Sequence, residues 1–131
     1  MNKTIYILFS VLILAFTACE KDYPTDGIAS KSDARIINVL IDVRDVPYEG
    51  QRTFYDHDAA VITIQVLPGY DWTTFTVYVS PVIYATMTPY GGSEEDWSSG
   101  SKSYTVTSGD ESNSNTYVVE IVEVTEFGNN L

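Results

Sequence analysis

The sequence has very little of the chemistry that enzymes and nucleic-acid-binding proteins usually need. It contains one cysteine, one histidine and only 7 basic residues against 18 acidic ones, for a net charge of −11. A single cysteine excludes a disulfide within the chain. A surface this acidic repels nucleic acid and anionic lipid head groups, so no nucleic-acid partner is expected.

The sequence also lacks a hydrophobic run long enough to span a bilayer. The longest run extends from Ile5 to Phe16 and is interrupted only by Ser10, whereas a spanning helix needs about 20 apolar residues. Lys3 precedes the run, and the small residues Thr17 and Ala18 follow it. We therefore predict that residues 1–18 are a cleaved signal peptide.

The only cysteine follows this run directly. The stretch Phe16-Thr17-Ala18-Cys19 resembles the bacterial lipobox, with Phe16 where leucine is usual. The resemblance implies that Cys19 becomes a lipidated N-terminus carrying palmitate or a similar acyl group. Two or more acyl chains give stable anchoring, so the membrane is an expected partner.

Residues 19–33 are polar, contain Pro24 and Gly27, and show no hydrophobic period, which indicates a flexible tether. Glu20 and Asp22 resemble the surface-export signal that follows the cysteine of many Bacteroidetes lipoproteins. A solvated linker explains them equally well. The expected location is the outer membrane, with exposure at the cell surface left open. Cleavage before Cys19 would leave 113 residues and, with Lys3 lost, a charge of −12.

From residue 34 the chain alternates as β-strands do, and no helical period of useful length occurs. Residues 34–43 are apolar almost throughout and predict a strand that is buried on both faces. The alternating runs predict a common core made of Ile62, Ile64, Val66, Phe75, Val77, Val79, Tyr104, Val106, Tyr117, Val119 and Ile121. Polar turns separate the runs, so the sequence predicts one immunoglobulin-like antiparallel β-sandwich over residues 34–126.

The order of short motifs also resembles the immunoglobulin-like or cadherin-like domains of Bacteroidetes surface lipoproteins. The matching residues are Pro68-Gly69-Tyr70-Asp71, Ser80, Ala85, Pro89, Gly91, Asp96-Trp97, Tyr104-Thr105-Val106 and Tyr117-Val118-Val119. The resemblance implies a β-sandwich attached to the cell surface. In larger relatives a second domain linked to carbohydrate metabolism follows this module, and the sequence up to Leu131 shows no such domain.

Three acidic clusters could offer oxygen ligands to a hard cation, which needs six or more of them. They are Asp56-His57-Asp58, Glu94-Glu95-Asp96 and Asp110-Glu111. Solvated loops are the favoured interpretation, and we expect neither a metal nor a cofactor. Because the sequence places no serine or cysteine beside His57, a nucleophilic triad has no support, and we expect no enzymatic activity.

Aromatic residues in turns are the remaining candidates for a site. Trp72, Tyr90 and Trp97 could stack on the C–H faces of sugars, although Trp97 could instead pack back to close the end of the sandwich. We therefore expect a non-catalytic extracellular binding module, with a glycan or a surface protein as partner. The alternative is a structural or adhesive spacer or assembly subunit without a small-molecule site.

Overall fold

The computed structural model describes residues 30–128. The predicted signal peptide, Cys19 and the tether up to residue 29 lie outside this range. Within it the regular elements are strands and two short 3-10 turns, and none is an α-helix. The elements are β1 (Ile36–Ile41), η1 (Tyr48–Gly50), β2 (Gln51–Asp56), β3 (Val61–Val66), η2 (Trp72–Thr74), β4 (Phe75–Pro81), β5 (Thr86–Thr88), β6 (Glu94–Glu95), β7 (Ser101–Thr107) and β8 (Ser114–Glu123).

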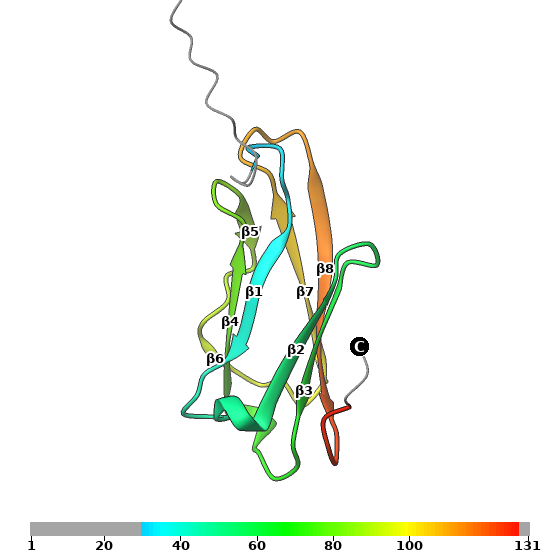
Figure 1. The fold of residues 1–131 in the computed structure, drawn as a ribbon. Coiled ribbons are helices and arrows are strands. Elements are labelled where there is room, and N and C mark those ends of the chain that lie inside the picture. The colour runs from blue at the N-terminus through cyan, green and yellow to red at the C-terminus, as the bar shows by residue number, and fades with distance from the viewer. Residues whose placement is uncertain (1–29, 129–131) are drawn as a thin grey trace, which may run out of the picture.

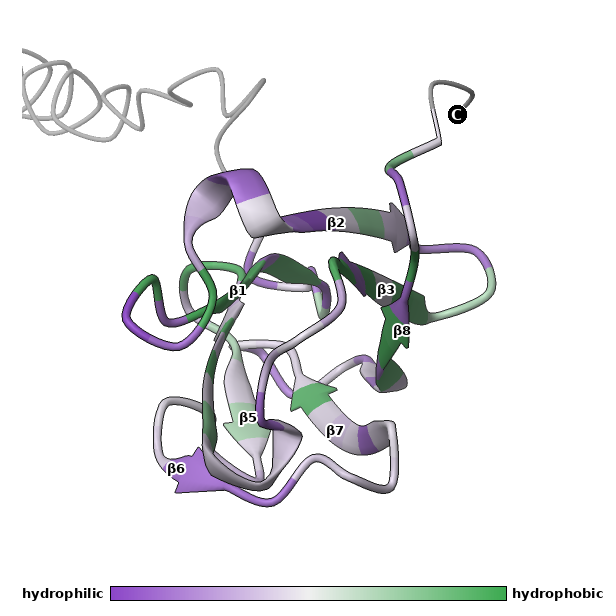
Figure 2. Ribbon diagram, turned by 90° about the horizontal axis from the view of Figure 1, so that it is seen from below, coloured by the Kyte–Doolittle hydropathy of each residue, from purple (hydrophilic) through white to green (hydrophobic). Residues whose placement is uncertain are grey.

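Two sheets form a sandwich, which confirms the predicted all-β fold (Figure 1). One sheet has three strands in the order β1-β4-β6, and the other has five in the order β2-β3-β8-β7-β5. Strands β3 and β8 carry hydrophobic residues in the middle of the larger sheet, whereas β6 at an edge is hydrophilic (Figure 2).

One strand pair departs from the predicted antiparallel arrangement. Strands β3 and β8 run parallel, with Ile62 opposite Val119 and Ile64 opposite Ile121. A tight turn makes sequence neighbours antiparallel, but a pair joined by a long crossover can run parallel. Between β3 and β8 the chain crosses to the other sheet and back, so hydrophobic alternation could not show the direction of this pair.

The predicted core is confirmed residue by residue. All eleven predicted core residues are between 0% and 7% exposed. They alternate with half-buried or exposed neighbours because successive side chains of a strand point to opposite faces. The same core includes residues outside the predicted set, among them Ile36, Ile41, Val46 and Trp97.

The first strand differs from its prediction. Ile37 is 54% exposed, and only one face of β1 is buried. The pairing of β1 with β4 shifts between Ile36 and Asn38, as at a β-bulge, where an extra residue is accommodated. Continuous apolar runs are typical of strands covered on both sides, but here the outer face of the three-stranded sheet has no covering layer within residues 30–128.

Strand β2 was not predicted, because its sequence is mostly polar, yet its side chains close one side of the sandwich. The Thr53 hydroxyl donates to the carbonyl of Val39 at 3.1 Å, and the Tyr55 hydroxyl accepts from the Val39 N–H at 2.9 Å. Gln51 accepts from the Ile41 N–H and donates to its carbonyl. These bonds satisfy peptide groups on the edge of β1 that faces away from β4.

Candidate ligand-binding site

The structure does not bring the three predicted aromatic residues to one surface. Trp97 is only 1% exposed, so its ring has no face to offer a ligand. The backbone N–H of Trp97 donates to the carbonyl of Trp72 at 2.7 Å, and the Lys102 ammonium lies 5.0 Å from the centroid of the Trp97 ring. Trp97 therefore packs into the core, which corrects its inclusion among the ligand-binding residues and agrees with the alternative that it closes the sandwich.

Trp72 is half-buried and also contributes to packing. Its ring lies 6.2 Å from that of Phe75 and packs against the core cluster. The turn η2 that carries it is held by Asp71, whose carboxylate accepts from the Thr73 N–H at 3.0 Å. Trp72 therefore has only part of its surface available to a ligand, and its role in binding stays a prediction.

Tyr90 is 83% exposed, and its neighbour Gly91 shows where it lies along β4. The next residue, Gly91, packs so closely on Val79 that an added Cβ would come within 2.8 Å of the Val79 nitrogen. Trp72 precedes Phe75 at the other end of β4, and four residues of strand span about 13 Å. Tyr90 and Trp72 therefore lie beside different parts of β4, and a ligand-binding role for Tyr90 stays a prediction.

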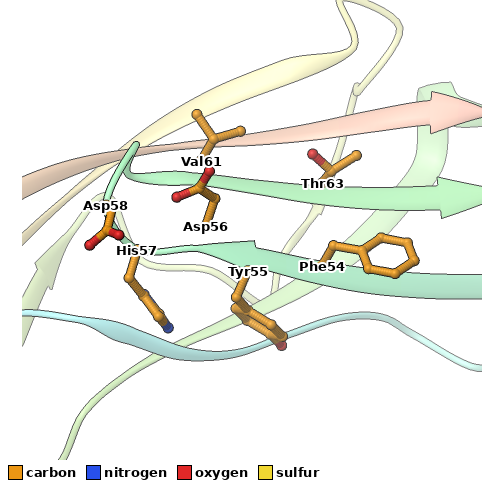
Figure 3. Close-up of a pocket in the computed structure, with 7 residues that line it drawn as sticks. All are labelled: Phe54, Tyr55, Asp56, His57, Asp58, Val61 and Thr63. Carbon is orange, nitrogen blue, oxygen red and sulfur yellow. The ribbon is translucent and has the colours of Figure 1, made fainter. Parts of the chain in front are cut away.

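A different hollow is present at the β2–β3 hairpin. It is open to solvent and has a volume of about 520 Å³. Its lining residues are Phe54, Tyr55, Asp56, His57, Asp58, Val61 and Thr63. Figure 3 shows that Asp56, Val61 and Thr63 extend from one side of the hairpin, and that Tyr55 and His57 extend from the other.

The first side of the hairpin combines apolar groups with carboxylates. Phe54 is opposite Thr63 across the ladder, and Asp56 is opposite Val61. On the adjoining strand β8, Glu120 lies beside Thr63 and accepts a hydrogen bond of 2.7 Å from its hydroxyl. This side can therefore offer a ligand one aromatic ring and hydrogen-bond acceptors.

The second side of the hairpin presents two rings in a fixed arrangement. The rings of Tyr55 and His57 are stacked, with 6.0 Å between centroids and 25° between planes. His57 Nδ1 lies 3.0 Å from the hydroxyl of the buried Tyr117, and the Tyr55 hydroxyl is bound to β1. These bonds fix the Tyr55 and His57 side chains before a ligand binds, so the two side chains would lose little conformational entropy on binding.

The turn of the hairpin is held by its own carboxylate. Asp56 Oδ1 accepts from the Ala59 N–H at 2.9 Å, and Ala60 follows with a positive φ of 53°. Among residues 30–128 no hydrogen bond is made to Asp56 Oδ2, so this oxygen can accept from a ligand hydroxyl.

The acidic clusters do not converge on a cation site. Among the described residues, no group of three or more histidine, cysteine, aspartate or glutamate side chains could hold a metal ion. Glu95 is paired with Lys102, and hydrogen bonding to this ammonium lowers the pKa of the Glu95 carboxyl. Asp96 and Asp110 accept from the nearby serines Ser98 and Ser112, which lowers the pKa of both carboxyls.

Sequence reasoning found only part of this hollow. It singled out Asp56-His57-Asp58 as a loop that could bind a cation, but not Phe54 or Tyr55. The available signal was the alternation through "RTFYDH", in which Phe54 and Asp56 share one side and Tyr55 and His57 the other. That signal was weak because the segment contains no apolar alternation that would mark it as a strand.

Within the part of the chain that the structure describes, no helix has the length and hydrophobicity needed to cross a membrane.

Two solved structures show the same fold. A Bacteroides thetaiotaomicron protein provisionally described as a glycoside hydrolase matches with a TM-score of 0.60 and 22% identity, over 73% of this chain and 26% of that protein. A Bacteroides fragilis protein provisionally described as secreted matches with a TM-score of 0.56 and 16% identity, over 72% of this chain and 98% of that protein. The chain thus corresponds to about a quarter of the first protein and nearly all of the second. No known family matches the chain, and no curated protein does.

Proposed function

We propose that this chain is a non-catalytic lipoprotein of the cell envelope whose β-sandwich binds an extracellular glycan at the β2–β3 hairpin. The observation that carries the proposal is the hairpin hollow, which offers Phe54 and the Asp56 carboxylate on one side and the stacked rings of Tyr55 and His57 on the other. Aromatic faces stack on the C–H faces of sugars, and carboxylates accept hydrogen bonds from sugar hydroxyls.

The charge of the chain supports a neutral ligand. At a net charge of −11, the protein repels anionic polymers, whereas a neutral glycan feels little of this field. Stacking and a few hydrogen bonds would carry the binding. A hollow this open buries little of a ligand's surface, so we expect a dissociation constant near millimolar. This corresponds to a binding free energy of about −4 kcal/mol. The affinity should hardly depend on salt.

The proposed location rests on the sequence before the described range. The lipobox-like Phe16-Thr17-Ala18-Cys19 would place an acyl anchor on Cys19 in the outer membrane. One further observation is consistent with this location. The similar Bacteroides fragilis protein is provisionally described as secreted.

The absence of catalysis is part of the proposal. His57 contacts the phenol of Tyr117 and the ring of Tyr55, and neither group is a serine or cysteine nucleophile that a histidine base activates. A glycosidase would need two carboxyls facing each other across a cleft, whereas the hollow here is open.

A structural or adhesive role is the alternative, and one surface favours it. Val118 and Val122 on β8 are 36% and 40% exposed on the outer face of the five-stranded sheet. Exposed apolar side chains on a sheet face can bind another protein. Such a role would leave the protein without affinity for any glycan.

The test is a glycan array probed with the mature protein, followed by calorimetry on the sugars that bind. We expect Asp56→Asn to weaken binding at least tenfold, because the amide keeps an oxygen for the Ala59 cap but loses the charge. Asp71→Asn is the control, since the Asp71 carboxylate also accepts from a backbone N–H in a turn, at η2, and is not a lining residue of the hollow. Equal affinity of both variants, or no glycan bound at millimolar concentration, would refute the proposal.

A further inference from the structure

Three segments meet at the end of the sandwich where the described chain begins. The Val82 N–H donates to the carbonyl of Arg35 at 2.8 Å, and the Asp110 N–H donates to the carbonyl of Lys31 at 3.0 Å. These bonds bring residues 30–35, the β4–β5 loop (82–85) and the β7–β8 turn (108–113) together. We call this group the N-terminal end (Figure 1).

Two large apolar side chains project from the N-terminal end. Ile83 and Tyr84 are consecutive in the β4–β5 loop and are 59% and 55% exposed. Single exposed apolar residues are normal on soluble proteins, whereas adjacent ones at a loop tip can mark an interaction site.

The loop holds this pair outward in a fixed conformation. Tyr84 has a φ of 73°, which is unfavourable for a bulky residue, and the Ala85 N–H closes the turn by donating to the carbonyl of Val82 at 3.1 Å. Gly109 packs beneath, where an added Cβ would lie 2.8 Å from the Tyr84 Cβ. Strain of this kind persists only where the surroundings enforce it.

The N-terminal end carries only a small net charge. Its charged residues are Lys31, Asp33, Arg35, Asp110 and Glu111. Two positive and three negative charges leave a net charge of −1. Arg35 and Asp33 are paired with each other at 2.6 Å. A net charge this small opposes the approach of this end to a neutral lipid surface only weakly.

The distance to the proposed lipid anchor is short. Cys19 and Ser30 are separated by eleven residue steps, for which a flexible chain has a root-mean-square length of roughly 18 Å. The ten-residue strand β8 alone is about 33 Å long. A lipid on Cys19 would thus keep the N-terminal end, and not the opposite one, next to the bilayer.

We propose that Ile83 and Tyr84 insert into the interfacial layer of the membrane and give the anchored protein a second point of contact. Tyrosine suits this layer because its ring is apolar and its hydroxyl stays hydrated. The contact would hold the sandwich upright, with the β2–β3 turn set back along its flank and free for a ligand (Figure 1). This inference rests on the proposed lipid anchor at Cys19, but not on the glycan site.

The test measures how deeply each end of the sandwich lies in a vesicle. The lipidated full-length protein is reconstituted in phosphatidylcholine vesicles that contain doxyl-labelled lipid, with an environment-sensitive dye on an introduced cysteine. Cys19 does not react with the dye when its sulfur carries lipid. We compare Ile83→Cys with Tyr48→Cys, because Tyr48 is an exposed residue of η1 at the opposite end. We expect the dye at 83 to be quenched several-fold more strongly, and equal quenching would overturn the proposal.

A second measurement leaves the loop intact, because a dye at 83 could itself enter the membrane. The dye is placed at Ser112→Cys, in the exposed β7–β8 turn of the same end. Its quenching should fall several-fold when Ile83→Ser and Tyr84→Asn are added, since asparagine tolerates the positive φ. Unchanged quenching would show that the pair does not contact lipid.

Flotation of each protein with the vesicles separates this proposal from the anchor. Proteins that float without quenching at 83 overturn the membrane contact alone. Proteins that fail to float, or that float equally well with Cys19→Ala, overturn the lipid anchor and this inference with it.

Discussion

At the residue scale, two glutamines of neighbouring strands should respond in opposite ways to the same substitution. Gln51 is 6% exposed and bonds the N–H and carbonyl of Ile41 and the carbonyl of Val46. Gln51→Leu leaves these buried groups unpaired and should lower the free energy of unfolding by about 2–5 kcal/mol. Gln65 Oε1 is buried without a partner among the described residues, so Gln65→Leu should be neutral or stabilising. Urea denaturation measures the free energy of unfolding of both variants. Equal losses in the two would contradict the different hydrogen bonding of Gln51 and Gln65.

At the element scale, β8 lies in the middle of the larger sheet and offers two adjacent valines on opposite faces. Val119 is 0% exposed and Val118 is 36% exposed. Val119→Ala should cost about 1–3 kcal/mol, because it removes buried methyl groups and leaves a cavity. Val118→Ala deletes the same atoms at the surface and should cost under about 0.5 kcal/mol. Thermal melts of both variants test the strand, and a larger loss at Val118 would mean that the face is wrongly assigned.

At the scale of the whole molecule, a fall in pH has two opposite effects on the stability of the fold. It weakens ion pairs, and it reduces the repulsion caused by the net negative charge. Hydrogen bonds from Arg44 and Arg35 lower the pKa of Asp42 and Asp33 respectively. A carboxyl with a lowered folded-state pKa stabilises the fold above its unfolded pKa, about 4, and this stability is lost as the pH falls below that value. We therefore expect the urea midpoint to drop below about pH 4, and to drop less in Asp42→Asn. If the urea midpoint instead rises as the pH falls below about 4, the loss of repulsion within the −11 chain outweighs the loss of the ion pairs.

The sequence alone determined the fold class and most of the core. Alternation in runs such as residues 61–66 and 75–79 identified the buried face of each strand correctly, because the period of two is a local property of the chain. It also indicated that Trp97 could pack inward. The lipobox-like motif remains a prediction, since Cys19 lies outside the described residues.

The tertiary structure alone decided how the strands pair and where the candidate site lies. The parallel pairing of β3 with β8 and the edge position of β2 depend on contacts between residues far apart in the chain. The positions of Trp72 and Tyr90 beside different parts of β4, and the meeting of Tyr55, His57 and Tyr117, likewise depend on how the whole chain packs. Local pattern constrains which face a side chain occupies, but only the packing of the whole chain decides which residues it meets there.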